Sequence, residues 1–269
     1  MREKREKAVA YIILVILAIV FALPLAWIIF ASLDKNASLA ASLPNMTLGN
    51  YRSILMKSTN LRSFANGLLI ALGTSILVVV FSGLASYALS RYEMKHKKLF
   101  MLTILFMNSL PVTTIMVPVF KIFVTVGLYN KLFGIVLFMT ASSMPYAIWM
   151  MKNFMDSVPV SLEEAAWIDG CSRFQGIFKV ILPLMGVCTV GIYTFSGCWG
   201  NFFVPFILLS ASEKYPASVM LYQFFSQHSV AYGELAAYSV IYTLPSIILY
   251  VITQKWMSKG FSLSGADKG

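Results

Sequence analysis

The chain has 269 residues, of which 58% are hydrophobic and only 12% are charged. Because an ordinary soluble domain carries about 25% charged residues, this composition argues against a water-soluble protein. The formal net charge of +10 would also fit a nucleic-acid-binding protein. The basic residues, however, cluster at the ends of long uncharged stretches, so we interpret them as flanks of membrane spans and expect no nucleic-acid partner.

Six uncharged stretches follow one another along the chain, each long enough to cross a bilayer. A transmembrane helix needs about 20 apolar residues. We therefore expect an all-α membrane protein, with a single transmembrane domain over residues 1–269 and about six transmembrane helices. The predicted spans are 9–32, 64–90, 99–123, 132–151, 184–209 and 235–255.

The first span follows a basic segment, residues 1–7, that resembles the start of a secretory signal. Its apolar run is longer than the roughly 7–15 residues of such signals, and no small-x-small cleavage site follows promptly. We expect it to remain as the first transmembrane helix.

The distribution of Lys and Arg predicts the orientation. With the N-terminus inside, fourteen of the 21 basic residues fall in inner segments and six in outer segments, while Lys121 lies near the outer end of the third span. This bias predicts that both termini are cytoplasmic. The segment 152–183 is then a cytoplasmic loop and 210–234 an outer loop.

The third span contains Pro111 and Pro118, so we expect it to be kinked. Two interpretations of the nearby polar residues stay open. Asn108, Thr113 and Thr114 either accompany a bend that neighbouring helices stabilise, or line a polar path for a solute.

The loop 152–183 has the sequence signals of two short helices. The segment 161–164 places a serine three residues ahead of a glutamate, which is the capping box that begins a helix, and Gly170 follows as a stop signal. The segment 172–175, S-R-F-Q, repeats the start signal, and Pro183 ends the second helix. We therefore expect a helix, a glycine turn and a helix at the membrane surface.

The first of these helices carries two adjacent alanines, Ala165 and Ala166. Small side chains let another surface approach closely, which suits docking into the groove of a partner protein. A helix that only lies at the membrane interface fits almost as well. Glu163 and Glu164 suit the positive N-terminal end of their own helix. The apolar residues beside the alanines are Leu162, Trp167 and Ile168.

The spacing in this loop also resembles a known signature. Glu164-Ala165-Ala166 is followed after three residues by Gly170, and after nine more by V-I-L-P at 180–183. This is similar to the E-A-A-x3-G-x9-I-x-L-P loop of bacterial ABC importer permeases, with Val180 in place of isoleucine. The resemblance implies the type I ABC importer permease fold, in which such a loop forms coupling helices that sit in a cleft of an ATPase subunit.

Three further segments resemble the carbohydrate uptake branch of that family, whose best-known member is the second permease of the maltose transporter. They are 87–91 (Y-A-L-S-R), the C-terminal segment 259–269 and 199–205 (W-G-N-F-F-V-P). The last is similar to W-N-[DE]-F-x-x-P, although Gly200 and Asn201 replace the usual asparagine and acidic residue. The resemblance implies import of a sugar or oligosaccharide across a bacterial inner (cytoplasmic) membrane.

The family resemblance also implies several partners. They are a second homologous permease, two ATP-binding subunits that bind ATP and magnesium, and an extracytoplasmic solute-binding protein. Closure of the ATPase pair would push the first loop helix, and residues 181–183 would pass the motion to the fifth span. The resemblance also implies that the tail 257–269 approaches the ATPase pair and that the outer loop 210–234 approaches the binding protein. Alternatively, both segments are solvated connectors. The implied ATPase-coupling residues are Leu162, Glu163, Glu164, Ala165, Ala166, Asp169, Gly170, Leu182 and Pro183.

The chain lacks the residues of an ATPase or another enzyme. No glycine is followed directly by lysine, so a G-x-x-x-x-G-K phosphate loop is missing. His96 and His228 are far apart and have no acid or cysteine set nearby, and the three cysteines lack metal-ligand spacing. We expect no catalytic residue, no metal site and no cofactor on this chain.

Sugar sites combine aromatic faces with amide or hydroxyl groups. Suitable side chains in suitable spans are Asn108, Tyr193, Trp199 and Asn201, although aromatic residues in membrane proteins also serve helix packing and interfaces.

Three rival functions remain. They are an ABC permease for another solute, a six-span secondary transporter or facilitator, and a membrane enzyme. The scarcity of charge inside the spans argues against ion coupling but not against an uncharged facilitator.

Overall fold

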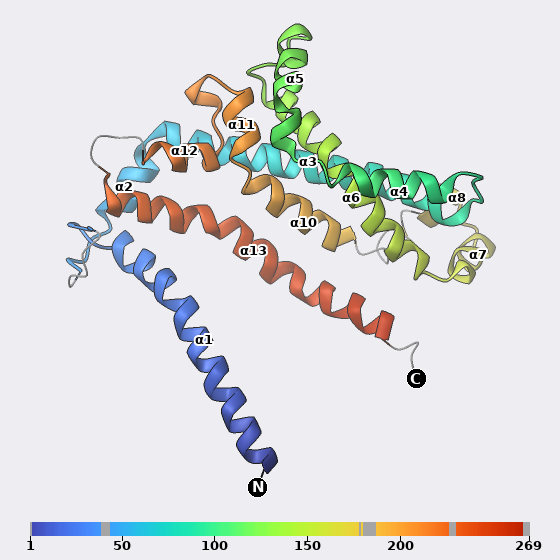
Figure 1. Cartoon of the computed structure of the whole chain (residues 1–269), viewed down its shortest axis with the longest axis horizontal. Coiled ribbons are helices and arrows are strands. Elements are labelled where there is room, and N and C mark those ends of the chain that lie inside the picture. The colour runs from blue at the N-terminus through green and yellow to red at the C-terminus, as the bar shows by residue number, and fades with distance from the viewer. Residues whose placement is uncertain (1, 39–43, 178, 180–186, 226–229, 266–269) are drawn as a thin grey trace. The chain divides into compact units, whose positions relative to one another are not determined.

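The computed structural model describes residues 2–38, 44–177, 179, 187–225 and 230–265. Within these ranges the regular structure is helical, and the sole β-contact is an isolated bridge between Asp34 and Met46 (Figure 1). The chain divides into two compact units, residues 1–61 with 220–244, and residues 62–219 with 245–269. The expectation of an all-α fold is confirmed.

The first unit contains α1 (Arg2–Ser32), α2 (Gly49–Met56) and the first part of α13 (Tyr232–Gly265). Polar contacts around the buried Asp34 hold the connection between α1 and α2. The Asp34 carboxylate accepts hydrogen bonds from the backbone N–H groups of Asn36 and Asn45, and the Asn50 amide donates to the carbonyls of Ser32 and Asp34. The α1–α2 connection is thereby tied to both of the helices that it joins.

The second unit is built on α3 (Ser58–Arg91) and α6 (Leu132–Asp156), against which α4 (Lys97–Met107) and α10 (Val187–Trp199) pack. One buried cluster joins Val78 of α3 to Met151 of α6 and Val190 of α10. A second joins α3, α4 and α6 through Leu89, Ile104 and Ile148. Since lipid tails are as apolar as these side chains, close van der Waals packing stabilises the unit more than removal from water does.

Four described helices are long and apolar enough to cross a membrane, namely Val9–Ser32, Ser58–Arg91, Leu132–Asp156 and Tyr232–Gln254. A fifth results if α4 and α5 (Val112–Thr125) form one broken span. The described residues thus provide at most five of the six expected spans. The start of the remaining span, 184–209, lies outside the described residues, and the rest forms α10 and the short α11 (Phe203–Leu208) with a break between them.

The predicted kink in the third span is present and is a full break. The axes of α4 and α5 differ by 91°. Asn108 ends α4, and Pro111, with φ −63° and ψ 129°, precedes the first residue of α5. Proline has no N–H to continue the helix of α4 and disfavours helical conformation in the residue before it. The predicted span 99–123 therefore consists of two helices, while Pro118 is accommodated inside α5.

The segment predicted to be an outer loop, 210–234, contains a 3-10 turn, η2 (Ser212–Lys214), and a short helix, α12 (Ala217–Gln223). Residues 226–229 of this segment lie outside the described part of the chain.

Candidate functional site

The loop after α6 forms the helix-turn-helix that its sequence predicts. It consists of α7 (Val160–Ile168) and α8 (Arg173–Gly176), which pack against each other (Figure 1). Gly170 has φ +85°, and Cys171 N–H donates to Ala166 O while Gly170 N–H donates to Trp167 O. This is the Schellman ending of a helix, which favours glycine at the left-handed position. The stop signal at Gly170 is confirmed.

The two predicted capping boxes had different outcomes. At the second, Ser172 N–H donates to Gln175 Oε1, and Gln175 N–H donates to Ser172 Oγ, so the reciprocal pair is present. At the first, α7 already begins at Val160 behind Pro159, and no side chain caps it. Because the φ of Pro159 (−59°) is set by its ring close to the helical value, the helix starts ahead of Ser161. The capping role predicted for Ser161 was wrong.

The most deeply placed charge of α7 is Glu163, whose residue surface is only 3% exposed. Its Oε1 accepts a hydrogen bond from Arg91 Nε, and its Oε2 accepts one from the Tyr87 hydroxyl at 3.3 Å. Arg91 Nη2 also donates to the Val158 carbonyl at 2.8 Å. We call Tyr87, Arg91, Val158 and Glu163 the α3–α7 anchor, since they join the last turns of α3 to α7.

A second polar contact joins the same end of α3 to the end of α6. Ser90 Oγ donates to Asp156 Oδ1 at 2.6 Å, and Lys152 forms an ion pair with Asp156 one turn apart on α6. Residues 157–159 then lead directly into α7. Two spans therefore hold α7 in place, α6 through the chain and α3 through side chains.

The side of α7 turned away from the α3–α7 anchor is exposed and partly apolar. Ile168 is 86% exposed and Leu162 is 41% exposed. The structure separates the two alanines expected to form one patch, because Ala165 is exposed and Ala166 is buried. Glu164 and Asp169 are also exposed, while Leu182 and Pro183 lie outside the described residues.

The turn between α7 and α8 is closed by Trp167. The Arg173 guanidinium lies 5.6 Å from the centre of its ring, a cation–π distance. Gly176 of α8 also lies beside this ring, since a Cβ atom there would be in van der Waals contact with the indole nitrogen of Trp167 at 3.5 Å. These contacts pack α7 and α8 against each other through the Trp167 ring.

The four predicted substrate-path residues have different surroundings. Trp199 is buried, with its ring stacked on Phe195. The Asn201 side-chain oxygen accepts a hydrogen bond from the Val204 N–H in the first turn of α11. Asn108 is exposed at the break between α4 and α5, and its amide donates to the Ile104 carbonyl. The buried ring of Trp199, the Asn201 side chain at the start of α11 and the exposed Asn108 thus have different surroundings.

Tyr193 has aromatic neighbours that the sequence did not single out. It is 52% exposed, and its ring centre lies 4.7 Å from that of Tyr146 on α6. Tyr146 in turn stacks on Trp149 at 6.0 Å. One sequence signal could have indicated part of this group. Tyr146 and Trp149 are three residues apart, so they lie on one face of a helix. Tyr146, Trp149 and Tyr193 form what we call the aromatic cluster.

These features define a multi-pass helical membrane protein with a short helical loop anchored to two of its spans. The chain belongs to the family of binding-protein-dependent transport system inner membrane components, whose family model matches residues 83–262. That range includes Arg91, α7 and α8. The predicted membership of an importer permease family is confirmed.

Individual relatives agree with this assignment. The chain is 32% identical over 251 residues to the sulfoquinovosyl glycerol transport system permease protein SmoH of Agrobacterium fabrum, covering 90% of this chain and 87% of that protein. It is 30% identical over 254 residues to the trehalose transport system permease protein SugB of Mycobacterium tuberculosis, covering 92% of each.

Among solved structures, a chain of a bacterial ABC transporter involved in the import of the acidic polysaccharide alginate superposes with a TM-score of 0.81. The match covers 95% of this chain and 98% of that one at 23% sequence identity, so it supports the fold.

Proposed function

We propose that this chain is a permease subunit of an ATP-driven importer, and that the exposed face of α7 docks on a separate ATP-binding subunit. The observation that carries this proposal is the pairing of two features on one short helix. Glu163 fixes α7 to α3, while Ile168 and Leu162 present apolar surface to a partner. The family's dependence on a binding protein supports an importer made of several subunits.

The coupling follows from how α7 is held. A permease without its own phosphate loop must turn the motion of a partner into a change of access, which needs a stiff connection. The α3–α7 anchor is such a connection, because its buried charges are paired and breaking them is costly. Displacement of α7 then moves the ends of α3 and α6 together. The two ATP-binding subunits bind the ATP and magnesium, and this chain is non-catalytic.

The orientation and remaining partners belong to the same proposal. The bias of Lys and Arg supports α7, α8 and both termini facing the cytoplasm across the inner membrane. A solute-binding protein delivers the solute from outside, in line with a similar chain solved in a transporter complex with an alginate pentasaccharide-bound periplasmic protein. A second homologous permease completes the path.

The cargo we propose is a sugar or oligosaccharide. Relatives are named for transport of sulfoquinovosyl glycerol, trehalose and arabinooligosaccharides. The aromatic cluster, in which Tyr193 is half exposed, offers ring faces of the kind that bind the apolar side of a sugar. Asn108, at the α4–α5 break, offers an amide of the kind that hydrogen-bonds to sugar hydroxyls.

Co-purification of the native complex, followed by ATPase and uptake assays, tests the coupling. Ile168→Glu is expected to abolish retention of the ATP-binding subunits, because it puts a charge into an apolar contact. The matched control is Val126→Glu, at an exposed apolar residue after α5 on the predicted outer side, and it is expected to retain them. Wild-type protein that brought down no nucleotide-binding subunit would disprove the proposal.

The cargo needs a separate measurement. Calorimetry with the cognate solute-binding protein is expected to show binding of a sugar or oligosaccharide. Binding of an amino acid or phosphate, and of no sugar, would leave the importer intact and overturn the carbohydrate assignment.

A further inference from the structure

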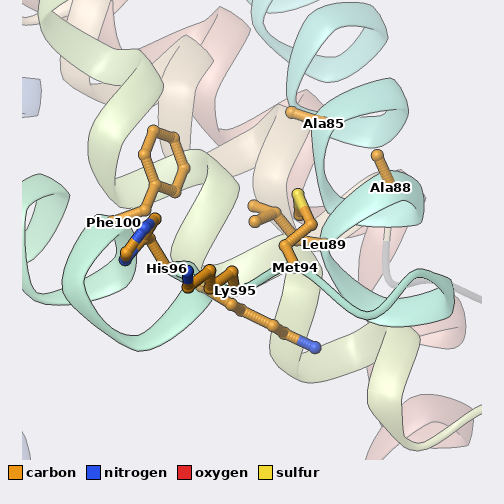
Figure 2. Close-up of a pocket in the computed structure, with 8 residues that line it drawn as sticks. Ala85, Ala88, Leu89, Met94, Lys95, His96 and Phe100 are labelled. Atoms are coloured by element: carbon orange, nitrogen blue, oxygen red, sulfur yellow. The ribbon is translucent and has the colours of Figure 1, made fainter.

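A pocket of about 560 Å3 lies where α3 ends and α4 begins. This volume is within the roughly 300–1,000 Å3 typical of ligand sites. Figure 2 shows Ala85, Ala88 and Leu89 on one side of the pocket and Phe100 on the other. None of its lining residues belongs to the α3–α7 anchor or to the aromatic cluster. The proposed coupling mechanism therefore leaves this pocket unexplained.

The pocket combines an apolar interior with a basic edge. Its interior is formed by small and apolar side chains of α3 and α4, joined by Met94 from the connecting segment. The edge is formed by Lys95, His96 and Lys97, which are consecutive in the chain.

Two acidic groups lie near this edge and do not cancel its charge. Glu93 is in the same connecting segment, and Asp156 is close enough to Lys97 to interact with it electrostatically. Asp156 already forms an ion pair with Lys152. Lys95, Lys97 and Lys98 therefore leave the surroundings of the pocket positive.

We propose that this pocket binds an anionic phospholipid, with part of an acyl chain against Ala85, Ala88 and Phe100 and the phosphate beside Lys95 and Lys97. One such lipid matches both parts of the pocket, because its acyl chain fits the apolar interior and its phosphate fits the basic edge. The position also fits, because α3 ends and α4 begins beside these lysines, and basic pockets between transmembrane helices are suited to anionic head groups. The proposal depends on the chain lying in a bilayer and not on the solute that it carries.

A lipid in this pocket would brace the end of α3. Leu89 lines the pocket and Arg91, two residues later, forms the α3–α7 anchor. The occupant would thus sit beside the element that receives the motion of α7.

Native mass spectrometry of the purified complex tests the proposal, after reconstitution in phosphatidylcholine vesicles containing phosphatidylglycerol. Wild-type complex is expected to retain phosphatidylglycerol selectively. Lys95→Glu should lower that retention by fivefold or more, since one basic group near a membrane surface contributes roughly a fivefold change in affinity. Ala88→Phe should lower it as well by filling the pocket without changing the charge.

Two matched controls separate the pocket from general effects. Lys179→Glu makes the same charge change at an exposed lysine after α8, and Ala65→Phe adds the same bulk to an exposed alanine of α3. Both should retain phosphatidylglycerol as the wild type does. Equal retention in Lys95→Glu and wild type, or equal loss in Lys179→Glu, would overturn the proposal. Retention by the isolated chain but not by the complex would assign the pocket to a protein partner and overturn it too.

Discussion

The loop formed by α7 and α8 and the aromatic end of α10 both carry sequence motifs, yet their side chains are used differently. In the loop, Glu163 is buried against a charge from another helix while Ile168 is exposed. In α10, Trp199 is buried in packing, and Tyr193 keeps half of its surface exposed. A motif therefore marks a segment, and only the contacts of each side chain separate the residues that hold the segment from those available to a partner or solute.

The largest expected effect is at the α3–α7 anchor. Glu163→Ala leaves the Arg91 guanidinium, whose side chain is only 12% exposed, without its carboxylate, and breaking a buried pair costs about 3–5 kcal/mol. Thermal unfolding of the purified protein in detergent should show this loss in the free energy of unfolding. Glu164→Ala, at the exposed neighbour, should stay within about 0.5 kcal/mol of the wild type.

A double-mutant cycle sharpens this prediction. Arg91→Ala combined with Glu163→Ala should cost less than the sum of the two single changes, because neither charge is then left unpaired. Additive costs would show that the ion pair between Arg91 and Glu163 does not hold α7. Glu163 would then not differ from the exposed residues of the loop in what it contributes to stability.

The next largest effect tests packing around Trp199. A Cβ at Gly67 of α3 would lie 2.9 Å from the Trp199 ring, whereas a Cβ at Gly197 meets nothing within 4 Å. Gly67→Ala should therefore cost about 1–3 kcal/mol through overpacking, while Gly197→Ala should leave the unfolding temperature close to that of the wild type. A near-neutral Gly67→Ala would mean that the Trp199 ring is free to move and is not a fixed packing element.

Gly170 tests the loop through backbone conformation alone. Its φ is +85° and a Cβ there would meet nothing within 4 Å, so Gly170→Ala is opposed by strain and not by a clash. The expected cost is about 1–2 kcal/mol, and Gly170→Asn should cost less because asparagine tolerates the left-handed region. If alanine and asparagine behave alike in unfolding measurements, the Schellman ending is not what stabilises the turn.

The sequence predicted the helical class, the helix-turn-helix and a kink near Pro111, because these depend on hydropathy, glycine and proline acting locally. It did not predict the partner of Glu163, since Arg91 is 72 residues earlier in the chain. Nor did it predict the 91° angle between α4 and α5, because proline breaks a helix without setting its new direction. The aromatic cluster was missed because its residues are also far apart in the chain. Tyr146 and Tyr193 meet only after α6 and α10 pack.

The smallest expected effect separates the two serines that were predicted to cap helices. Ser172 exchanges hydrogen bonds with Gln175, so Ser172→Ala should cost about 0.5–2 kcal/mol of unfolding free energy. Ser161 lies inside the first turn of α7, where no side chain caps the helix, so Ser161→Ala should be neutral or slightly stabilising. Thermal unfolding of the two variants side by side measures the difference. Equal costs would mean that α7 begins at Ser161 and that Pro159 does not determine its start.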